Sequence, residues 1–161
     1  MLHNEERFNQ WRPALFDGQF DWDFLLPAFK ETKIQPMDFD AVIERYGNFL
    51  IFETKAAGKG IELGQSITLT CAWKRGATVI HLEGKCPAEI CGFALYTPSE
   101  YMEEMGRPKE MIGSREMRKG DAFDVLFLTR KWFCFASNKK QPTREEWDKE
   151  LWLWDYERTA A

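Results

Sequence analysis

The sequence predicts an α/β or α+β domain built around a mixed β-sheet. Two strand-like segments joined by a short turn, residues 37–44 and 49–55, indicate a β-hairpin. A helical pattern over residues 63–74 leads directly into a further strand-like segment, residues 78–82. A capping box at residues 143–146 predicts another helix near the end of the chain. This mixture of strands and helices is typical of a sheet with helices packed against it.

The remaining segments are assigned from the same periodicities. Residues 4–15 space their apolar side chains at near-helical intervals and predict an N-terminal helix. Residues 93–97 predict another strand, whereas the polar and basic segment 103–120 predicts a long loop or a mobile excursion. Residues 124–129 and 132–136 are rich in apolar and aromatic side chains and predict a second hairpin.

The predicted helix over residues 63–74 rests on a simple repeat. Leu63, Ile67 and Cys71 recur at four-residue intervals, as residues on one face of a helix do. Gly76 follows the last periodic residues and is a typical helix terminator.

Length and charge limit what the protein can be. A chain of 161 residues with 44% hydrophobic residues is large enough for one domain, residues 1–161, with a core of its own. Its 22 Lys and Arg against 26 Asp and Glu give a formal net charge of -4. That balance argues against a protein that coats nucleic acid by neutralising phosphates wholesale. It is compatible with an enzyme that has a basic groove on an acidic body.

The four cysteines predict free thiols in a reducing compartment. Cys86 and Cys91 have an unusual spacing for a zinc finger, and no second close pair completes such a site. No apolar run approaches the roughly 20 residues of a membrane span, and the N-terminus lacks the layout of a signal peptide. We therefore expect a cytoplasmic protein without a membrane partner.

The predicted hairpin brings charged side chains together. Alternate residues of a strand share a face, so Glu53 and Lys55 point the same way. A two-residue turn at residues 46–47 places Asp40 opposite Glu53, and a turn at residues 47–48 places it opposite Lys55. Either register puts Asp40 on the same face as the other two.

Such a group is costly for a purely structural hairpin. Directly opposed residues have Cβ atoms only about 4.5–5.5 Å apart, and like charges at that separation destabilise the pair. A divalent metal relieves this cost, because carboxylate oxygens, carbonyl oxygens and water are the ligands that Mg²⁺ accepts. Lys55 can then orient the attacking water or stabilise charge on a phosphate. The pattern favours metal-assisted phosphodiester hydrolysis over the alternative, a surface hairpin with solvated charges.

This constellation resembles a known signature. Asp40 followed by Glu53-Thr54-Lys55 is similar to the D…(D/E)xK motif of the PD-(D/E)XK nuclease superfamily, and its spacing is especially similar to that of archaeal Holliday-junction resolvases. Gln65, in the helix predicted after the motif, resembles the glutamine that RecB-like members carry there.

The resemblance implies a fold and roles for these residues. It covers residues 34–83, and it implies a restriction-endonuclease-like α-β-β-β-α-β core over about residues 1–83. Residues 84–161 would be β and helical additions to one nuclease domain. The resemblance further implies a metal site and catalytic residues. The Mg²⁺ ligands would be Asp40, Glu53 and the Thr54 carbonyl, with Mn²⁺ as a substitute; Lys55 would be the catalytic lysine, and Gln65 would orient a phosphate or water.

Two alternatives for the ligand set stay open. Asp38 shares the face of Asp40 and is the other candidate for the first carboxylate. A glutamate of the first helix, Glu5 or Glu6, would supply a further ligand, as in some relatives.

The expected function is a magnesium-dependent DNA endonuclease or exonuclease. DNA is the expected partner, and a homodimer is compatible with relatives that cut two strands. The compact format is compatible with a phage or mobile-element origin. The alternative function is a catalytically silent nuclease-fold module that binds nucleic acid or a protein partner. His81, within an apolar strand, is expected to be a packed residue rather than a general base.

Overall fold

The computed structural model describes residue 28 and residues 37–85, 89–98 and 110–151. The chain divides into two units, Met1–Asp38 and Phe39–Ala161, and the sheet and its helices belong to the second unit. The helix predicted over residues 4–15 lies outside the described residues.

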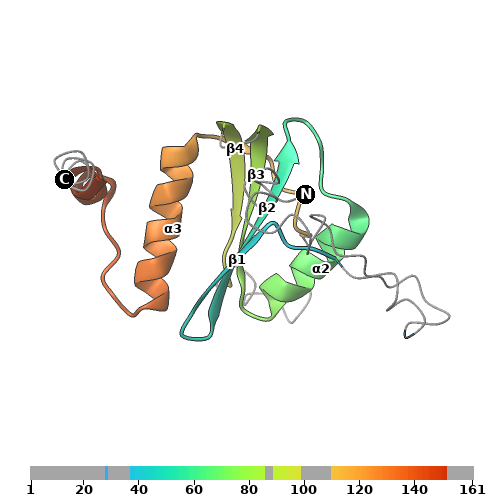
Figure 1. Ribbon diagram of the computed structural model, residues 1–161, viewed down its shortest axis with the longest axis horizontal. Coiled ribbons are helices and arrows are strands. Elements are labelled where there is room, and N and C mark those ends of the chain that lie inside the picture. The colour runs from blue at the N-terminus through green and yellow to red at the C-terminus, as the bar shows by residue number, and fades with distance from the viewer. Residues whose placement is uncertain (1–27, 29–36, 86–88, 99–109, 152–161) are drawn as a thin grey trace, which may run out of the picture. The chain divides into compact units, whose positions relative to one another are not determined.

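A five-stranded sheet is the framework of this unit, with its strands in the order β1-β2-β3-β4-β5 (Figure 1). The strands are β1 (Ala41–Arg45), β2 (Asn48–Ala56), β3 (Thr78–Lys85), β4 (Glu89–Tyr96) and β5 (Arg118–Lys119). Strands β2 and β3 run parallel, and the other neighbouring strands run antiparallel. With helices beside it, this mixed sheet confirms the predicted α/β or α+β class.

The turn between β1 and β2 fixes the register of the hairpin. Tyr46 and Gly47 have φ angles of 50° and 79°, and a two-residue type I′ turn requires positive φ at both positions. Ala41 pairs with Phe52. Of the two predicted registers, the structure therefore has the one with its turn at residues 46–47. The first strand begins at Ala41, later than the predicted start at residue 37.

Helix α2 spans Leu63–Lys74, the range that the sequence predicts. The four-residue repeat that indicates this helix faces outward, since Leu63 is 70% exposed and Ile67 is 48% exposed. The face that packs against the sheet mixes apolar and hydroxyl side chains: Ser66, Leu69, Thr70 and Trp73.

Helices α2 and α3 (Ala122–Ala136) cover opposite faces of the sheet (Figure 1). Because side chains alternate along β2, Ile51 joins the core beneath α2 and Leu50 joins the core beneath α3. The core on the α2 side includes Leu69, Trp73, Val79, Ala94, Tyr96 and Ile112. The core on the α3 side includes Ile80, Leu82, Phe93, Val125, Trp132 and Ala136.

Helix α3 shows that the predicted second hairpin is wrong. The Asp121 side chain accepts hydrogen bonds from the N–H groups of Phe123 and Asp124, and the Asp124 side chain accepts one from Asp121 N–H. This capping box starts a helix in a segment whose aromatic and β-branched composition resembles a strand. The buried positions then recur at helical spacing against the sheet: Val125, Trp132 and Ala136.

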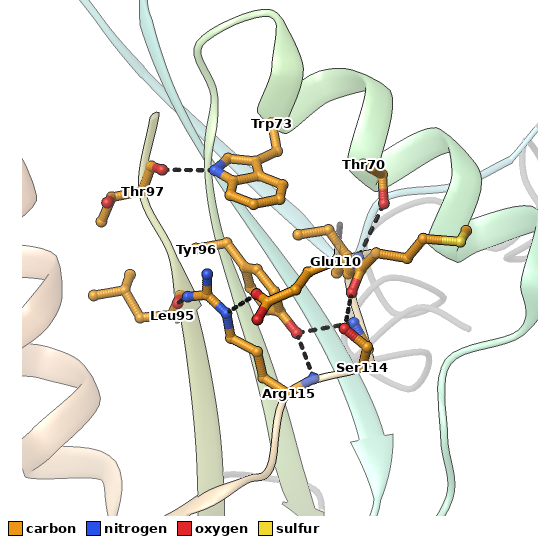
Figure 2. Close-up of polar contacts among 11 residues, drawn as sticks. Thr70, Trp73, Leu95, Tyr96, Thr97, Glu110, Ser114 and Arg115 are labelled. Carbon is orange, nitrogen blue, oxygen red and sulfur yellow. Dashed lines mark hydrogen bonds and ion pairs between the residues drawn. The ribbon is translucent and has the colours of Figure 1, made fainter. Parts of the chain in front are cut away.

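Residues 110–115, part of the predicted loop, are anchored on α2 and β4 (Figure 2). The Ile112 N–H donates to Thr70 Oγ1 at 2.9 Å, and Ser66 Oγ donates to the Ile112 carbonyl. These bonds explain why two hydroxyl side chains of α2 are buried, since each satisfies a backbone group that is itself out of water.

Arg115, in the same segment, is engaged within the protein rather than presented as a basic loop residue (Figure 2). Its Nε donates to Glu110 Oε2 at 2.9 Å, and its guanidinium also donates to the Leu95 carbonyl. The guanidinium carbon lies 4.4 Å from the ring centroid of Tyr96 and 5.7 Å from that of Trp73. Residues 110–115 thus form a loop, as predicted, and hydrogen bonds hold this loop against α2 and β4. Arg118 and Lys119 instead form strand β5, which the sequence does not predict.

The capping box near the end of the chain is confirmed. Thr143 N–H donates to Glu146 Oε2 at 2.7 Å, Glu146 N–H donates to Thr143 Oγ1 at 3.2 Å, and residues 144–151 are helical. Cys71, Cys91 and Cys134 are free thiols. None of the helices in the described part of the chain combines the length and apolar character needed to cross a lipid bilayer.

Replacing Asp121 tests the cap of α3. We expect Asp121→Ala to lower the free energy of unfolding by about 1 kcal/mol, because two backbone N–H groups lose their acceptor. Asp121→Asn is the matched control, since asparagine accepts the same hydrogen bonds. Urea unfolding followed by circular dichroism measures both variants. Equal unfolding midpoints for the alanine variant and the wild type would contradict this account of the cap.

Candidate functional site

The second half of β2 carries the central residues of the candidate site. Ile51 packs beneath α2, and the alternation of side chains along the strand places Glu53 and Lys55 on the same face. Glu53 is only 1% exposed. A buried glutamate at the end of an apolar strand needs partners, because burying an isolated charge is expensive.

The two carboxylate oxygens of Glu53 have different environments. Oε1 forms an ion pair with Lys55 Nζ at 2.7 Å, and the lysine side chain is 21% exposed. Oε2 is buried and has no hydrogen-bond partner among the described residues. One oxygen of this carboxylate is thus paired with Lys55, and the other is available for a further interaction.

Burial raises the pKa of Glu53 above its ordinary value, since the charged form is desolvated. The hydrogen bond from Lys55 opposes this shift and lowers the pKa, whereas the negative charge of Asp40 raises it further. Gln65 has the smallest effect and lowers the pKa. Asp40 and Lys55 thus act in opposite directions on the pKa of one buried carboxylate.

Asp40 is held in place by Thr54. Continuing the β1–β2 register by one residue from Ala41 places Asp40 opposite Glu53. Asp40 Oδ2 accepts hydrogen bonds from the backbone N–H of Thr54 at 2.7 Å and from its Oγ1 at 2.6 Å. The sequence assigns Thr54 a role only through its carbonyl, and the structure adds that its N–H and hydroxyl orient Asp40.

Gln65, in the first turn of α2, is half-buried and not a solvated polar residue. It lies close enough to Glu53 to lower the pKa of that carboxyl slightly. Its Oε1 is buried without a hydrogen-bond partner in the described part of the chain. The helix that follows the hairpin thus directs a polar side chain toward the carboxylate of β2.

His81 is a member of this group that the sequence does not reveal. The parallel pairing of β2 with β3 places His81 beside Glu53, and the imidazole is 2% exposed with both ring nitrogens unpartnered within the described residues. Burial lowers the pKa of His81; the carboxylate of Glu83 opposes that shift, and the charge of Lys55 adds to it. The sequence signal for His81 is a histidine inside an apolar strand. Only the pairing of β2 with β3 places that histidine beside Glu53.

Other predicted members are not placed in this group. Asp38 belongs to the first unit, and Glu5 and Glu6 lie outside the described residues. Among the residues that the structure describes, no three His, Cys, Asp or Glu side chains form a ready-made metal-binding group. Several basic residues that would suit the edge of a nucleic-acid groove are exposed: Lys59, Lys74, Arg75, Lys85, Lys119, Lys139 and Lys140.

Comparisons of the chain with protein-family models, with curated proteins and with solved structures find no match.

The burial of Glu53 has a consequence for stability. A carboxyl with a raised pKa in the folded state favours folding at low pH, and this contribution is lost as the pH rises through the folded-state pKa. We therefore expect Glu53→Gln to be more stable than the wild type at pH 8, by about 1 kcal/mol, and the difference to shrink toward pH 4. Thermal unfolding across this pH range measures it.

The exposed Glu116→Gln is the matched control and should show no such pH-dependent gain. If Glu53→Gln were less stable than the wild type at every pH, the ion pair with Lys55 would outweigh the cost of burying the charge.

Proposed function

We propose that this protein is a divalent-metal-dependent phosphodiesterase that cuts DNA, a nuclease of the PD-(D/E)XK type. The observation that carries the proposal is the register of the hairpin, which sets Asp40 opposite a buried Glu53 that contacts Lys55. Two neighbouring carboxylates and a lysine at the end of an apolar strand are difficult to explain by packing alone. They are the minimum set for metal-assisted hydrolysis of a phosphodiester.

The order of elements supports this proposal. In the superfamily that the motif resembles, one strand carries the acidic residue, the next carries E-x-K, and a helix and a further strand follow. Here Asp40 directly precedes β1, Glu53 and Lys55 lie on β2, and α2 connects β2 to the parallel strand β3. Two strands precede α2 within residues 37–85, where the expected core has three.

The donor atoms suit a divalent ion. Glu53 Oε2 is buried with no hydrogen-bond partner among the residues that the structure describes, and Asp40 brings a second carboxylate to the same register position. Because Mg²⁺ prefers oxygen ligands, Asp40, Glu53 and the Thr54 carbonyl would hold it, with Mn²⁺ able to substitute. When bound, such an ion supplies a Lewis acid that activates water and stabilises negative charge on a phosphate.

The side chains of the chain itself account for positioning and charge. Lys55, partly exposed beside Glu53, is suited to stabilising the charge that develops on the phosphate and to orienting the attacking water. The amide of Gln65 orients the Glu53 carboxylate, and Thr54 fixes the direction of Asp40.

A second candidate function is a silent nuclease-fold module that binds nucleic acid or a protein partner without cutting. The observation that favours it is that Lys55 occupies one oxygen of Glu53 while no ready-made group of three metal-binding side chains is present in the described residues. The unpartnered oxygen of Glu53 and the position of Asp40 favour the enzyme instead. Assembly into a dimer that cuts both strands stays a prediction.

Plasmid cleavage distinguishes these functions. We expect the wild type to nick supercoiled DNA with Mg²⁺ or Mn²⁺ and to be inactive with EDTA. Lys55→Ala should lower the rate by about a hundredfold or more, because the group that orients the water is lost. Lys149→Ala is the matched control, since this exposed lysine pairs with Glu145 on the helix of residues 144–151 and should leave the rate unchanged.

Binding of DNA without cleavage under any divalent ion would support the silent module. Cleavage that persists unchanged in Lys55→Ala would show that the proposed site is not the catalytic one.

A further inference from the structure

The turn between β1 and β2 carries a side chain that the fold does not need. Tyr46 is 71% exposed, and it occupies the first position of a type I′ turn with a φ of 50°. Asparagine, aspartate and glycine are preferred at that position, because a bulky side chain at positive φ is an outlier. Asn138, the other non-glycine residue with a positive φ in the described part of the chain, follows this preference. An exposed aromatic ring in an unfavourable backbone conformation points to a role other than folding.

Arg45 and the end of α3 hold the Tyr46 ring in place. The guanidinium carbon of Arg45 lies 4.0 Å from the ring centroid, and Arg45 Nη2 donates to the Tyr46 hydroxyl at 3.0 Å. Arg45 Nε donates to Ser137 Oγ at 3.2 Å, directly after the last residue of α3 (Figure 1). The exposed ring therefore belongs to a surface of defined shape, formed by the tip of the hairpin and the end of a helix that is distant in sequence.

Two cationic side chains belong to the same surface. The guanidinium carbon of Arg45 and the Nζ of Lys139 lie 5.4 Å and 5.8 Å from the ring centroid of Phe133. Neither cation forms an ion pair with another described residue. The carboxylate of Glu44 accepts a hydrogen bond from the backbone of the turn, and it lies on the opposite face of β1 from Arg45. Arg45, Tyr46 and Lys139 together form the tip surface, which joins an exposed aromatic ring to two unneutralised positive charges.

We propose that the tip surface binds an unpaired strand of DNA, in which a base stacks on Tyr46 and phosphates contact Arg45 and Lys139. This inference rests on the proposed nuclease function and names its substrate class, DNA with a single-stranded portion. An aromatic ring beside basic side chains is the usual means of binding a single strand, since an unpaired base has a free π-face. Arg45 retains three of its five N–H donors for phosphate, because Ser137 and Tyr46 use two.

The tip surface lies at the opposite end of β2 from the catalytic residues. Lys55 follows Asn48, the residue after the turn, by seven positions along this strand. At about 3.3 Å per residue, the separation is about 23 Å. The tip surface would therefore hold a part of the substrate that lies several nucleotides from the bond that is cut. Because the two regions are separate, strand binding and cleavage can be lost independently.

Fluorescence anisotropy with a labelled oligothymidylate of about 15 nucleotides, a length suited to single-strand sites, tests the proposal. The full-length protein is used in EDTA, so that nothing is cut. We expect the wild type to bind this strand more tightly than a blunt duplex of the same length. Tyr46→Asn should weaken strand binding by about 10-fold or more, because stacking on one base is lost. Thermal unfolding should show no loss of stability in this variant, since asparagine suits the turn.

Matched variants separate stacking and charge from general surface effects. Tyr46→Phe keeps an aromatic ring and should keep the affinity. Phe123→Ala removes a ring that is 61% exposed at the other end of α3, and it should also leave the affinity unchanged. Lys139→Gln should weaken binding and reduce the slope of log affinity against log salt by about 0.7, the value for one phosphate contact on a single strand. Lys149→Gln should not, because this lysine pairs with Glu145.

The proposal is overturned if the wild type does not bind the oligothymidylate, or if Tyr46→Asn binds it as tightly as the wild type does. If Tyr46→Asn does not fold, the affinity and salt slope of Lys139→Gln decide instead. Metal-dependent plasmid nicking without strand binding at Tyr46 would leave the nuclease proposal standing and remove this one. Strand binding that depends on Tyr46, with no cleavage under any divalent ion, would remove the nuclease and assign the tip surface to a silent DNA-binding module.

Discussion

The ion pair between Glu53 and Lys55 is the interaction on which the site depends. It places a nearly inaccessible carboxylate at the end of β2, where the neighbouring positions on that face belong to a hydrophobic core. A buried pair of this kind is weak support for stability, because desolvation offsets much of the attraction. It does constrain geometry, since one carboxylate oxygen is fixed against Lys55 and the other is left buried without a hydrogen-bond partner among the described residues.

The crossover from β2 through α2 to β3 supplies the rest of the site. Parallel strands need such a connection, and it brings the first turn of the helix to the end of β2 where Glu53 lies. Gln65 lies in the first turn of this helix, and His81 lies opposite Glu53 on the next strand. The hydroxyl groups of Thr70 and Ser66 form hydrogen bonds with the backbone of Ile112 and so fix the position of helix α2 on the sheet. A segment distant in sequence thus helps to position the site.

The sequence predicts the parts of the structure that local signals determine. A tight turn between residues 46 and 48, the range of α2 and the capping box of Thr143 depend on nearby residues and are confirmed. The choice between a turn at residues 46–47 and one at residues 47–48 was left open by the sequence and is decided by the structure. The hairpin predicted in place of α3 is wrong. The prediction followed the aromatic and β-branched composition of the segment, whereas the capping box at Asp121 begins a helix. His81 could not be placed in the site from sequence, since its neighbour Glu53 is set by the pairing of strands separated by a helix.

The location of the unpartnered polar atoms distinguishes a functional site from imperfect packing. A strand that only packed beneath α2 would continue the apolar pattern of Ile51 and Val79 toward its end, and a branched aliphatic side chain would fit there without loss. Instead, both parallel strands change to ionisable residues at the same level, Glu53 and His81. Ligands in sheets of this kind bind beyond the carboxyl ends of parallel strands, and the Glu53–His81 pair lies three pairs before that end of the β2–β3 ladder. The free-energy cost of burying Glu53 and His81 therefore arises near the end of the sheet where a ligand would bind, and a bound ligand would offset it.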